Sequence, residues 1–434
     1  MDEKLIPKDS SSPRNSVVAI ETLQGDADHH VEPDPEPMEE VRELLKLITG
    51  TTVLEFLPGF VSILLAGNMG GPNTQHYVDA ATISVMSLGL GLASALDTLC
   101  SQAYGAKRSD KIGIYFQTGV VVLSVALVPM LVINSFAEPI LNLLGQHTHL
   151  VRKVMQCQNI VKPLVAIAVI GNLVNLAAGY GLAYHTSLAF NGIAIARSLG
   201  NITLALLLVP YFMWQPQHLR QWWGHGWNIK AAVSYVNLFV QIGCPGMVML
   251  AVEVWAFEIL AILAGILPDS AVALSTHAVL MNVNIILYTA FYGIAVAASI
   301  RVGNCLGADQ PKKAKMACFL ALTITLGVSM VYGAAIMAMW SPLEIADGLN
   351  AVMQGIFRGA GKQKPAAVAN VIGYYGGGIP LGAILAFAAD MGVEGLWWGI
   401  GFGIAATWLS LTFMMLNYWR WDQLASEARQ RTAQ

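Results

Sequence analysis

The chain has 434 residues, of which 55% are hydrophobic and only 12% are charged. A soluble domain carries roughly 25% charged residues, so this composition excludes a water-soluble protein and indicates one embedded in a membrane. The net charge of −3 gives no reason to expect a nucleic-acid partner. The five cysteines are scattered and form no Cys-x-x-Cys pair, so we expect neither a disulfide framework nor a metal site.

The first 45 residues form an acidic segment that differs from the rest of the chain. It contains the run Glu32-Pro-Asp-Pro-Glu-Pro37 and no long apolar stretch. Such a segment buries too little apolar surface to offset the entropy that is lost on ordering. We therefore expect residues 1–45 to be a disordered cytoplasmic tail, and membrane insertion to depend on the first spanning helix.

Ten apolar stretches follow this segment, and each is long enough to cross a membrane as a helix. A hydrocarbon core about 30 Å thick requires roughly 20 apolar residues in a helix. The stretches lie near residues 52–72, 80–100, 113–136, 163–184, 188–213, 237–267, 272–299, 314–340, 366–388 and 393–417. This pattern predicts an all-α polytopic membrane protein.

Apart from Arg197, which lies inside a span, the basic residues are confined to alternate loops and to the ends of the chain. Lysine and arginine cluster at both ends of the chain and near residues 107–111, 152–162, 220–230, 301–315 and 358–364. Neither residue occurs in the intervening loops at 73–79, 137–149, 184–190, 268–272 and 389–394. Because basic loops are retained on the cytoplasmic side, both termini and every basic loop are expected in the cytoplasm.

This orientation leaves two gaps in the count of spans. The loop at 137–149 is expected outside and the loop at 152–162 inside, yet too few residues separate them to cross a bilayer. The same problem arises between Trp340 and Arg358. Each position therefore requires one more helix than the sequence supplies.

An internal repeat with an offset of 202 residues relates the two halves. The segment Lys162-Pro163 to Gly171 matches Lys364-Pro365 to Gly373, and Gln102-Ala-Tyr-Gly-Ala106 matches Asn304-Cys-Leu-Gly-Ala308. Both copies have the same sidedness, so the repeat is parallel, as in many secondary transporters. We expect two lobes of six helices, with the fourth helix of each truncated. The expected divisions are an N-lobe (46–214), a cytoplasmic linker (215–235), a C-lobe (236–418) and a cytoplasmic C-terminal tail (419–434).

Five motifs resemble the eukaryotic branch of the MATE (multidrug and toxic compound extrusion) family. They are the segments Leu96–Ala106, Glu253–Glu258, Arg301–Ala308, Asp347–Gln363 and Tyr374–Gly382. The resemblance implies two lobes that alternate access to a central cavity and export organic solutes. It also implies that acidic residues of the seventh family helix take part in cation binding and proton coupling. Family members have complete fourth and tenth helices, whereas this sequence keeps only the cytoplasmic ends, near 150–162 and 342–358.

Acidic residues inside apolar helices are costly and are therefore functional candidates. Glu253 and Glu258 lie in one predicted helix, and five positions correspond to about 140° around its axis. The two carboxyls therefore face different directions, and each is either a cation site or a structural hydrogen-bonding group. Asp347 lies where similar proteins place a cavity carboxylate in the tenth helix.

Weaker candidates complete the predicted site. Asn282 lies where animal relatives carry a third carboxylate, and its amide, which cannot carry a proton, serves either hydrogen bonding or packing. Glu55 precedes Pro58-Gly59 and is either an ion site or a residue that extends towards the cytoplasmic surface. Trp255, Tyr288 and Tyr375 offer aromatic faces that attract organic cations or serve only in packing.

No motif for ATP binding or hydrolytic chemistry occurs, so we expect a transporter and not an enzyme. The expected mechanism is antiport of organic solutes, especially organic cations, against protons, with Na⁺ as the alternative coupling ion and no cofactor. The expected partners are small organic solutes and membrane lipids, and the chain is expected to be a monomer in a plasma, vacuolar or endosomal membrane. A transport-dead truncated isoform or membrane scaffold is the main alternative. A lipid flippase is disfavoured because the spans are rich in acids and poor in arginine.

Overall fold

The computed structural model describes residues 36–48, 75–133, 162–185, 189–223, 226–335 and 341–433, and every regular element in these ranges is helical. The all-α architecture expected from the sequence is therefore confirmed. The expected span near 52–72 and the remnant near 150–162 lie outside the described residues.

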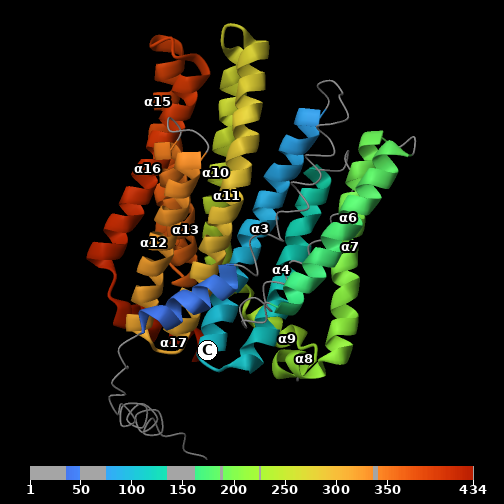
Figure 1. Ribbon diagram of the computed structural model, residues 1–434. Coiled ribbons are helices and arrows are strands. Elements are labelled where there is room, and N and C mark those ends of the chain that lie inside the picture. Colours follow the sequence, from blue (N-terminus) through green and yellow to red (C-terminus); the bar gives the residue numbers. More distant parts are fainter. Residues whose placement is uncertain are drawn as a thin grey trace, which may run out of the picture. The chain divides into compact units, whose positions relative to one another are not determined.

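The described part of the N-lobe contains four long helices (Figure 1), and each coincides with an expected span. They are α3 (Gln75–Gly105), α4 (Ser109–Ile133), α6 (Lys162–Tyr184) and α7 (Ala189–Trp214). Helix α3 packs along α4, and α6 packs along α7. These are the antiparallel pairs that short connections between spans produce.

Two short helices, α8 (Pro216–Trp223) and α9 (Ile229–Ser234), occupy the segment between the lobes. The buried ring of Trp222 packs edge-on against Phe116 of α4 at 5.6 Å and Phe212 of α7 at 6.4 Å between ring centroids. Aromatic pairs in this geometry add to the stabilisation from apolar burial. The linker is therefore packed onto the N-lobe.

The C-lobe contains the helices that most clearly qualify as membrane spans. Of the described residues, five segments are long and apolar enough to cross a bilayer: Val236–Ile266, Ser270–Gly307, Pro311–Val331, Gln363–Ala388 and Gly392–Tyr418. They comprise α10 (Val236–Ile266), α11 (Ser270–Gly307), α12 (Pro311–Ala335), the run from α14 to η2, and α16 (Gly392–Tyr418). The chain is thus an integral, multi-pass membrane protein.

The span Gln363–Ala388 is not a uniform α-helix. It passes from α14 (Gln363–Asn370) through a π-helical stretch, η1 (Val371–Gly378), then α15 (Ile379–Ala383) and a second π-helical stretch, η2 (Ile384–Ala388). Pro380 lies in α15 and has no backbone N–H to donate to the preceding turn. A proline inside a helix is a recognised cause of such local changes in hydrogen bonding.

Helix α13 (Ser341–Gly359) lies where the sequence predicted the remnant of a truncated helix, near residues 342–358. Its 19 residues give a length of about 28 Å, close to the thickness of the hydrocarbon core. It packs against α11, α12 and α16. Its bounds match the expected remnant near 342–358, and it is not among the five described segments that are long and apolar enough to cross a bilayer. Because polar residues alternate with apolar ones along α13, it does not form an apolar stretch in the sequence. The truncated fourth helix of the C-lobe therefore stays a prediction.

Part of the acidic tail is also ordered. Residues 37–48 form a helix, although residues up to 45 were expected to be disordered. Arg301 of α11 donates Nε and Nη2 hydrogen bonds of 2.7 and 2.6 Å to the two carboxylate oxygens of Glu40. Leu44 and Leu47 are fully buried in the core that includes α3. This bidentate ion pair and the burial of the two leucines stabilise a helix that composition alone did not predict.

The repeated motifs lie where the two lobes meet, at the crossing of α3 and α11. A Cβ atom built on Gly105 would overlap the carbonyl oxygen of Asn304, and one built on Gly307 would overlap that of Gln102. Gly105 corresponds to Gly307 and Gln102 to Asn304 at the offset of 202 residues. The crossing is therefore pseudo-symmetric, and each lobe supplies the glycine that the other lobe's backbone requires.

Replacing Gly307 by alanine is expected to destabilise the protein by about 1–3 kcal/mol, because the added methyl group must push the two backbones apart. Gly327 of α12 has nothing within 4 Å of an added Cβ, so Gly327→Ala is a matched control that should gain up to about 1 kcal/mol from helix propensity. Thermal unfolding in detergent measures both effects. Equal melting temperatures for the two variants would contradict the proposed role of the crossing.

Candidate functional site

Helix α13 carries a polar stripe that faces the interior of the C-lobe. Glu344, Asp347, Asn350, Gln354 and Arg358 recur at spacings of three or four residues, and each is at most 8% exposed. Because an α-helix has 3.6 residues per turn, these side chains share one face. Buried polar groups are costly unless they are paired, so their partners on neighbouring helices define the candidate site.

The first partner is Glu253 of α10, whose side chain is 5% exposed. Gln354 Nε2 donates a hydrogen bond of 3.1 Å to Glu253 Oε2. Tyr288 of α11 is a second hydrogen-bonding neighbour of this carboxyl. Side chains from α10, α11 and α13 therefore converge on one buried acid.

The second acid is Asp347, also buried. Asn284 Nδ2 of α11 donates a 3.4 Å hydrogen bond to Asp347 Oδ2, whereas Oδ1 has no hydrogen-bond partner among the described residues. The carboxyls of Asp347 and Glu253 are close enough to interact electrostatically. Asp347 also interacts electrostatically with Glu344, so the cluster contains three acids, and Oδ1 of Asp347 is free to accept a proton or a cation.

The buried guanidinium of Arg358 supplies a positive charge at the far end of the stripe. Its Cζ atom lies 5.8 Å from the ring centroid of Tyr292, within the range of a cation–π interaction, and it interacts electrostatically with Glu253. Tyr292 also packs against Tyr288 at 6.2 Å between centroids. The acids therefore adjoin aromatic faces and one fixed cation.

Amide side chains hold the neighbouring helices to this cluster. Asn350 Nδ2 donates a 3.3 Å hydrogen bond to the hydroxyl of Tyr374, and Asn370 Nδ2 donates a 3.0 Å bond to the carbonyl oxygen of Met249. Tyr374 and both asparagines are completely buried. The π-helical segment and α14 are thus tied to α13 and α10 by hydrogen bonds in the interior.

The structure brings together Glu253, Asp347 and Tyr288, three of the residues expected to form the site. The others lie outside the cluster: Trp255 is 46% exposed, Asn282 is exposed, and Glu258 and Tyr375 are half-buried. Glu55 lies outside the described residues.

Sequence reasoning missed Asn284, Asn350, Gln354 and Arg358. For the three residues of α13 a signal was present, because polar residues three or four positions apart mark one helix face. Asn284 had no such signal: Asn282 and Asn284 lie two positions apart, and only packing decides which one faces Asp347.

Comparisons with known proteins agree with this architecture. The MatE family model matches residues 48–153 and 245–343, one stretch in each lobe. Multidrug and toxin extrusion protein 1 of Mus musculus is 31% identical, over 84% of this chain and 72% of the mouse protein. Protein DETOXIFICATION 16 of Arabidopsis thaliana is 29% identical over 446 aligned positions, covering 91% of each protein.

Solved structures extend the likeness to three dimensions. The crystal structure of the eukaryotic MATE transporter AtDTX14 superimposes with a TM-score of 0.81 at 27% identity, over 91% of this chain and 99% of that chain. An outward-facing multidrug resistance MATE family transporter, 14% identical, shares the fold with a TM-score of 0.73, over 91% of this chain and 97% of that one. This chain belongs to the MATE family of multidrug and toxin extrusion transporters.

Proposed function

We propose that this protein exports small organic cations from the cytoplasm in exchange for protons, by alternating access between its two lobes. The observation that carries the proposal is the pair of buried carboxyls, Glu253 and Asp347, which interact with each other in the C-lobe. The names of the relatives, multidrug and toxin extrusion proteins, support xenobiotic compounds as the substrates.

The charges of this cluster suit an exchange of one cation for another. Three carboxyls, those of Glu253, Asp347 and Glu344, face one guanidinium, that of Arg358, so ionising all three leaves excess negative charge, which is costly in a medium of low dielectric constant. A proton or a monovalent organic cation lowers this excess by one charge. Because both ligands neutralise the same charge, binding of one disfavours the other, and such competition couples their movements in opposite directions.

The surroundings of the acids favour an organic cation over a hydrated metal ion. The ring of Tyr288 lies next to the acids and can contribute cation–π attraction of about 0.5–2 kcal/mol. The free Oδ1 of Asp347 can accept a hydrogen bond from a protonated amine. Sodium is the alternative coupling ion, and the proposed exchange uses no cofactor.

The short length of α13 raises the question of whether this chain transports substrate. The alignment to the Arabidopsis relative spans more positions than the 434 residues of this chain, so the relative contains segments without a counterpart here. In the C-lobe, however, α13 retains both Asp347 and the hydrogen bond from Gln354 to Glu253. This preserved cluster favours an active transporter over a transport-dead isoform or scaffold.

The distribution of basic residues supports an orientation with both termini in the cytoplasm. In this orientation α17 (Trp421–Ala433) and the loops that follow α3 and α11 lie on the cytoplasmic side. Substrate would enter from this side and leave on the other. We propose that a single chain performs the cycle, since each of its lobes supplies half of the pseudo-symmetric crossing.

Glu253→Gln is expected to abolish efflux of a model organic cation driven by a pH gradient, because the amide keeps the shape of the side chain but carries neither a proton nor a negative charge. The measurement is uptake into inside-out proteoliposomes with an imposed pH gradient, compared with a sodium gradient of equal size. We expect at least a tenfold loss of proton-driven transport, the change produced by about 1.4 kcal/mol.

The matched control is Glu394→Gln in the first turn of α16, outside the cluster. It should transport as the parent does. Unchanged pH-driven transport by Glu253→Gln would remove this residue from the mechanism. Transport driven by the sodium gradient alone would show that Na⁺, and not the proton, is the coupling ion.

Epitope tags at the N- and C-termini should both be inaccessible to antibody in intact cells and become accessible after permeabilisation, because every basic loop is expected in the cytoplasm. A tag placed at residues 389–391, between η2 and α16, where there is neither lysine nor arginine, serves as the external control. Staining of the N-terminal tag in intact cells would refute the orientation.

A further inference from the structure

Helix α17, expected to be part of a C-terminal tail, is docked against the ends of helices from both lobes. It packs against α3 of the N-lobe and against α11 and α12 of the C-lobe. Leu424, Ala425 and Ala428 are buried at helical spacing along one face. An amphipathic helix with its apolar face fully covered is part of the folded protein.

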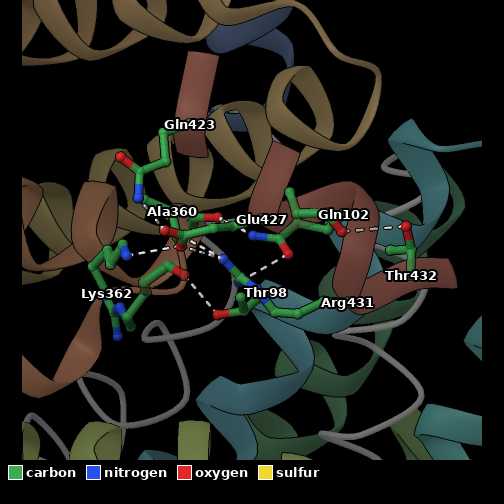
Figure 2. A network of polar contacts seen from close by, with 11 residues as sticks. Thr98, Gln102, Ala360, Lys362, Gln423, Glu427, Arg431 and Thr432 are labelled. Atoms are coloured by element: carbon green, nitrogen blue, oxygen red, sulfur yellow. Dashed lines mark hydrogen bonds and ion pairs between the residues drawn. The ribbon is translucent and has the colours of Figure 1, made fainter. Parts of the chain in front are cut away.

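Arg431, near the end of this helix, contacts both lobes at once (Figure 2). Its Nη1 donates a 3.0 Å hydrogen bond to Gln102 Oε1 on α3, and its Nη2 donates a 3.4 Å bond to the carbonyl oxygen of Ala360, just after α13. The hydroxyl of Tyr115 on α4 donates a 3.2 Å bond to the carbonyl oxygen of Arg431. The side chain is only 15% exposed.

Glu427, one turn before Arg431 on α17, pairs this helix with the C-lobe. Its Oε2 lies 2.7 Å from Lys362 Nζ in the C-lobe and 3.6 Å from Arg431 Nη2, one turn along α17. Burial lowers the pKa of the Arg431 guanidinium from its usual value, and the Glu427 carboxylate opposes this effect. The helix is thus paired with the C-lobe through Glu427, while Arg431 reaches across to the N-lobe.

Gly361 provides the space that this arginine occupies. Its φ angle is +71°, in the left-handed region that favours glycine, and a Cβ atom on it would overlap Arg431 Nη1. The bare backbone therefore lets the guanidinium reach Gln102 and Ala360 together.

Further hydrogen bonds join the lobes beside Arg431. Thr98 Oγ1 of α3 donates a 2.6 Å bond to the carbonyl oxygen of Arg358, and Gln102 Nε2 donates a 3.0 Å bond to that of Gly359. Gln363 Nε2 donates a 2.7 Å bond to Thr98 Oγ1. All of these partners lie at the end of α13 or directly after it, so this surface must separate whenever the lobes part on the α17 side.

We propose that Arg431 is a latch that holds the two lobes together on the side of α17, and that the transport cycle must release it before substrate can enter from that side. Arg431 acts as a positioning residue, since it contacts the lobes and not the acids Glu253 and Asp347. The proposal rests on alternating access, but it requires neither proton coupling nor a particular substrate.

The test uses a cysteine at the lobe interface as a reporter. Ser101 of α3 is fully buried against α11, where its hydroxyl fills the space beside Gly303. In Ser101→Cys, a bulky water-soluble maleimide can react only when α3 and α11 separate. Labelling is measured by mass spectrometry on the full chain in lipid nanodiscs, without substrate or gradient, so its outcome is independent of the proposed function.

Arg431→Ala and Gly361→Ala are each expected to speed labelling of Ser101→Cys about tenfold. Losing one charge-assisted hydrogen bond raises the population in which the lobes are apart by about this factor. Arg431→Lys should lie between these and the parent, because lysine keeps the charge but not the forked geometry. Arg429→Ala, which removes an exposed ion pair of the same helix with Asp309, should leave the rate unchanged.

Equal labelling of the parent and both alanine variants would overturn the proposal. So would a matching increase in labelling of Cys318, which is buried inside the C-lobe, because that result indicates general unfolding. In proteoliposomes, Arg431→Ala should lower both the maximal rate and the KM for substrate on the α17 side. The reason is that a larger fraction of the molecules is then in the conformation open to that side. A lower rate with unchanged KM would equally count against the latch.

Discussion

The close approach of two backbones, where α3 crosses α11, is the constraint on which the relation between the lobes depends. Gly105 and Gly307 leave no room for a side chain, so each helix presents its glycine to a carbonyl oxygen of the other. Such contact allows dense packing across the lobe boundary without any large apolar side chain. It also keeps the repeated polar residues Gln102 and Asn304 at the point where the lobes separate or meet.

Helix α13 connects the two functional regions of the protein. Its buried stripe carries Asp347 and Gln354, which belong to the acidic cluster. Its last turn presents the carbonyl oxygens of Arg358 and Gly359 to hydrogen-bond donors from the N-lobe. A change of charge in the cluster and a change of contact between lobes therefore act on one short helix, which is the physical requirement for coupling binding to access.

The same helix explains why a chain with a shortened span can keep its architecture. Its 19 residues keep the buried stripe within the C-lobe, and the polar residues of α13 are tolerated because they face protein and not lipid. Their cost is offset by the hydrogen bonds to Glu253, Asn284 and Tyr374. Its neighbours α11, α12 and α16 cover its remaining surface.

Local sequence was sufficient for the features that depend on one helix at a time. Apolar length predicted the long helices α3, α4, α6, α7, α10, α11, α12 and α16 and the run from α14 to η2. The cost of burying a charge in lipid singled out Glu253 and Glu258, and the family resemblance pointed to Asp347. The repeat predicted two equivalent lobes. It could not show that Gln102 and Asn304 meet at the lobe boundary, because that contact joins residues about 200 positions apart.

Other features were decided only by tertiary structure. The helix at 37–48 depends on an ion pair between Glu40 and Arg301, and the docking of α17 depends on Arg431 reaching Gln102. Asn284 pairs with Asp347 while Asn282 remains exposed, although both are amides of one apolar helix. In each case the sequence by itself determined which chemical groups were available and which segments were helical. The fold alone decided which of those groups came close enough to pair, because hydrogen bonds and ion pairs form only over a few ångströms.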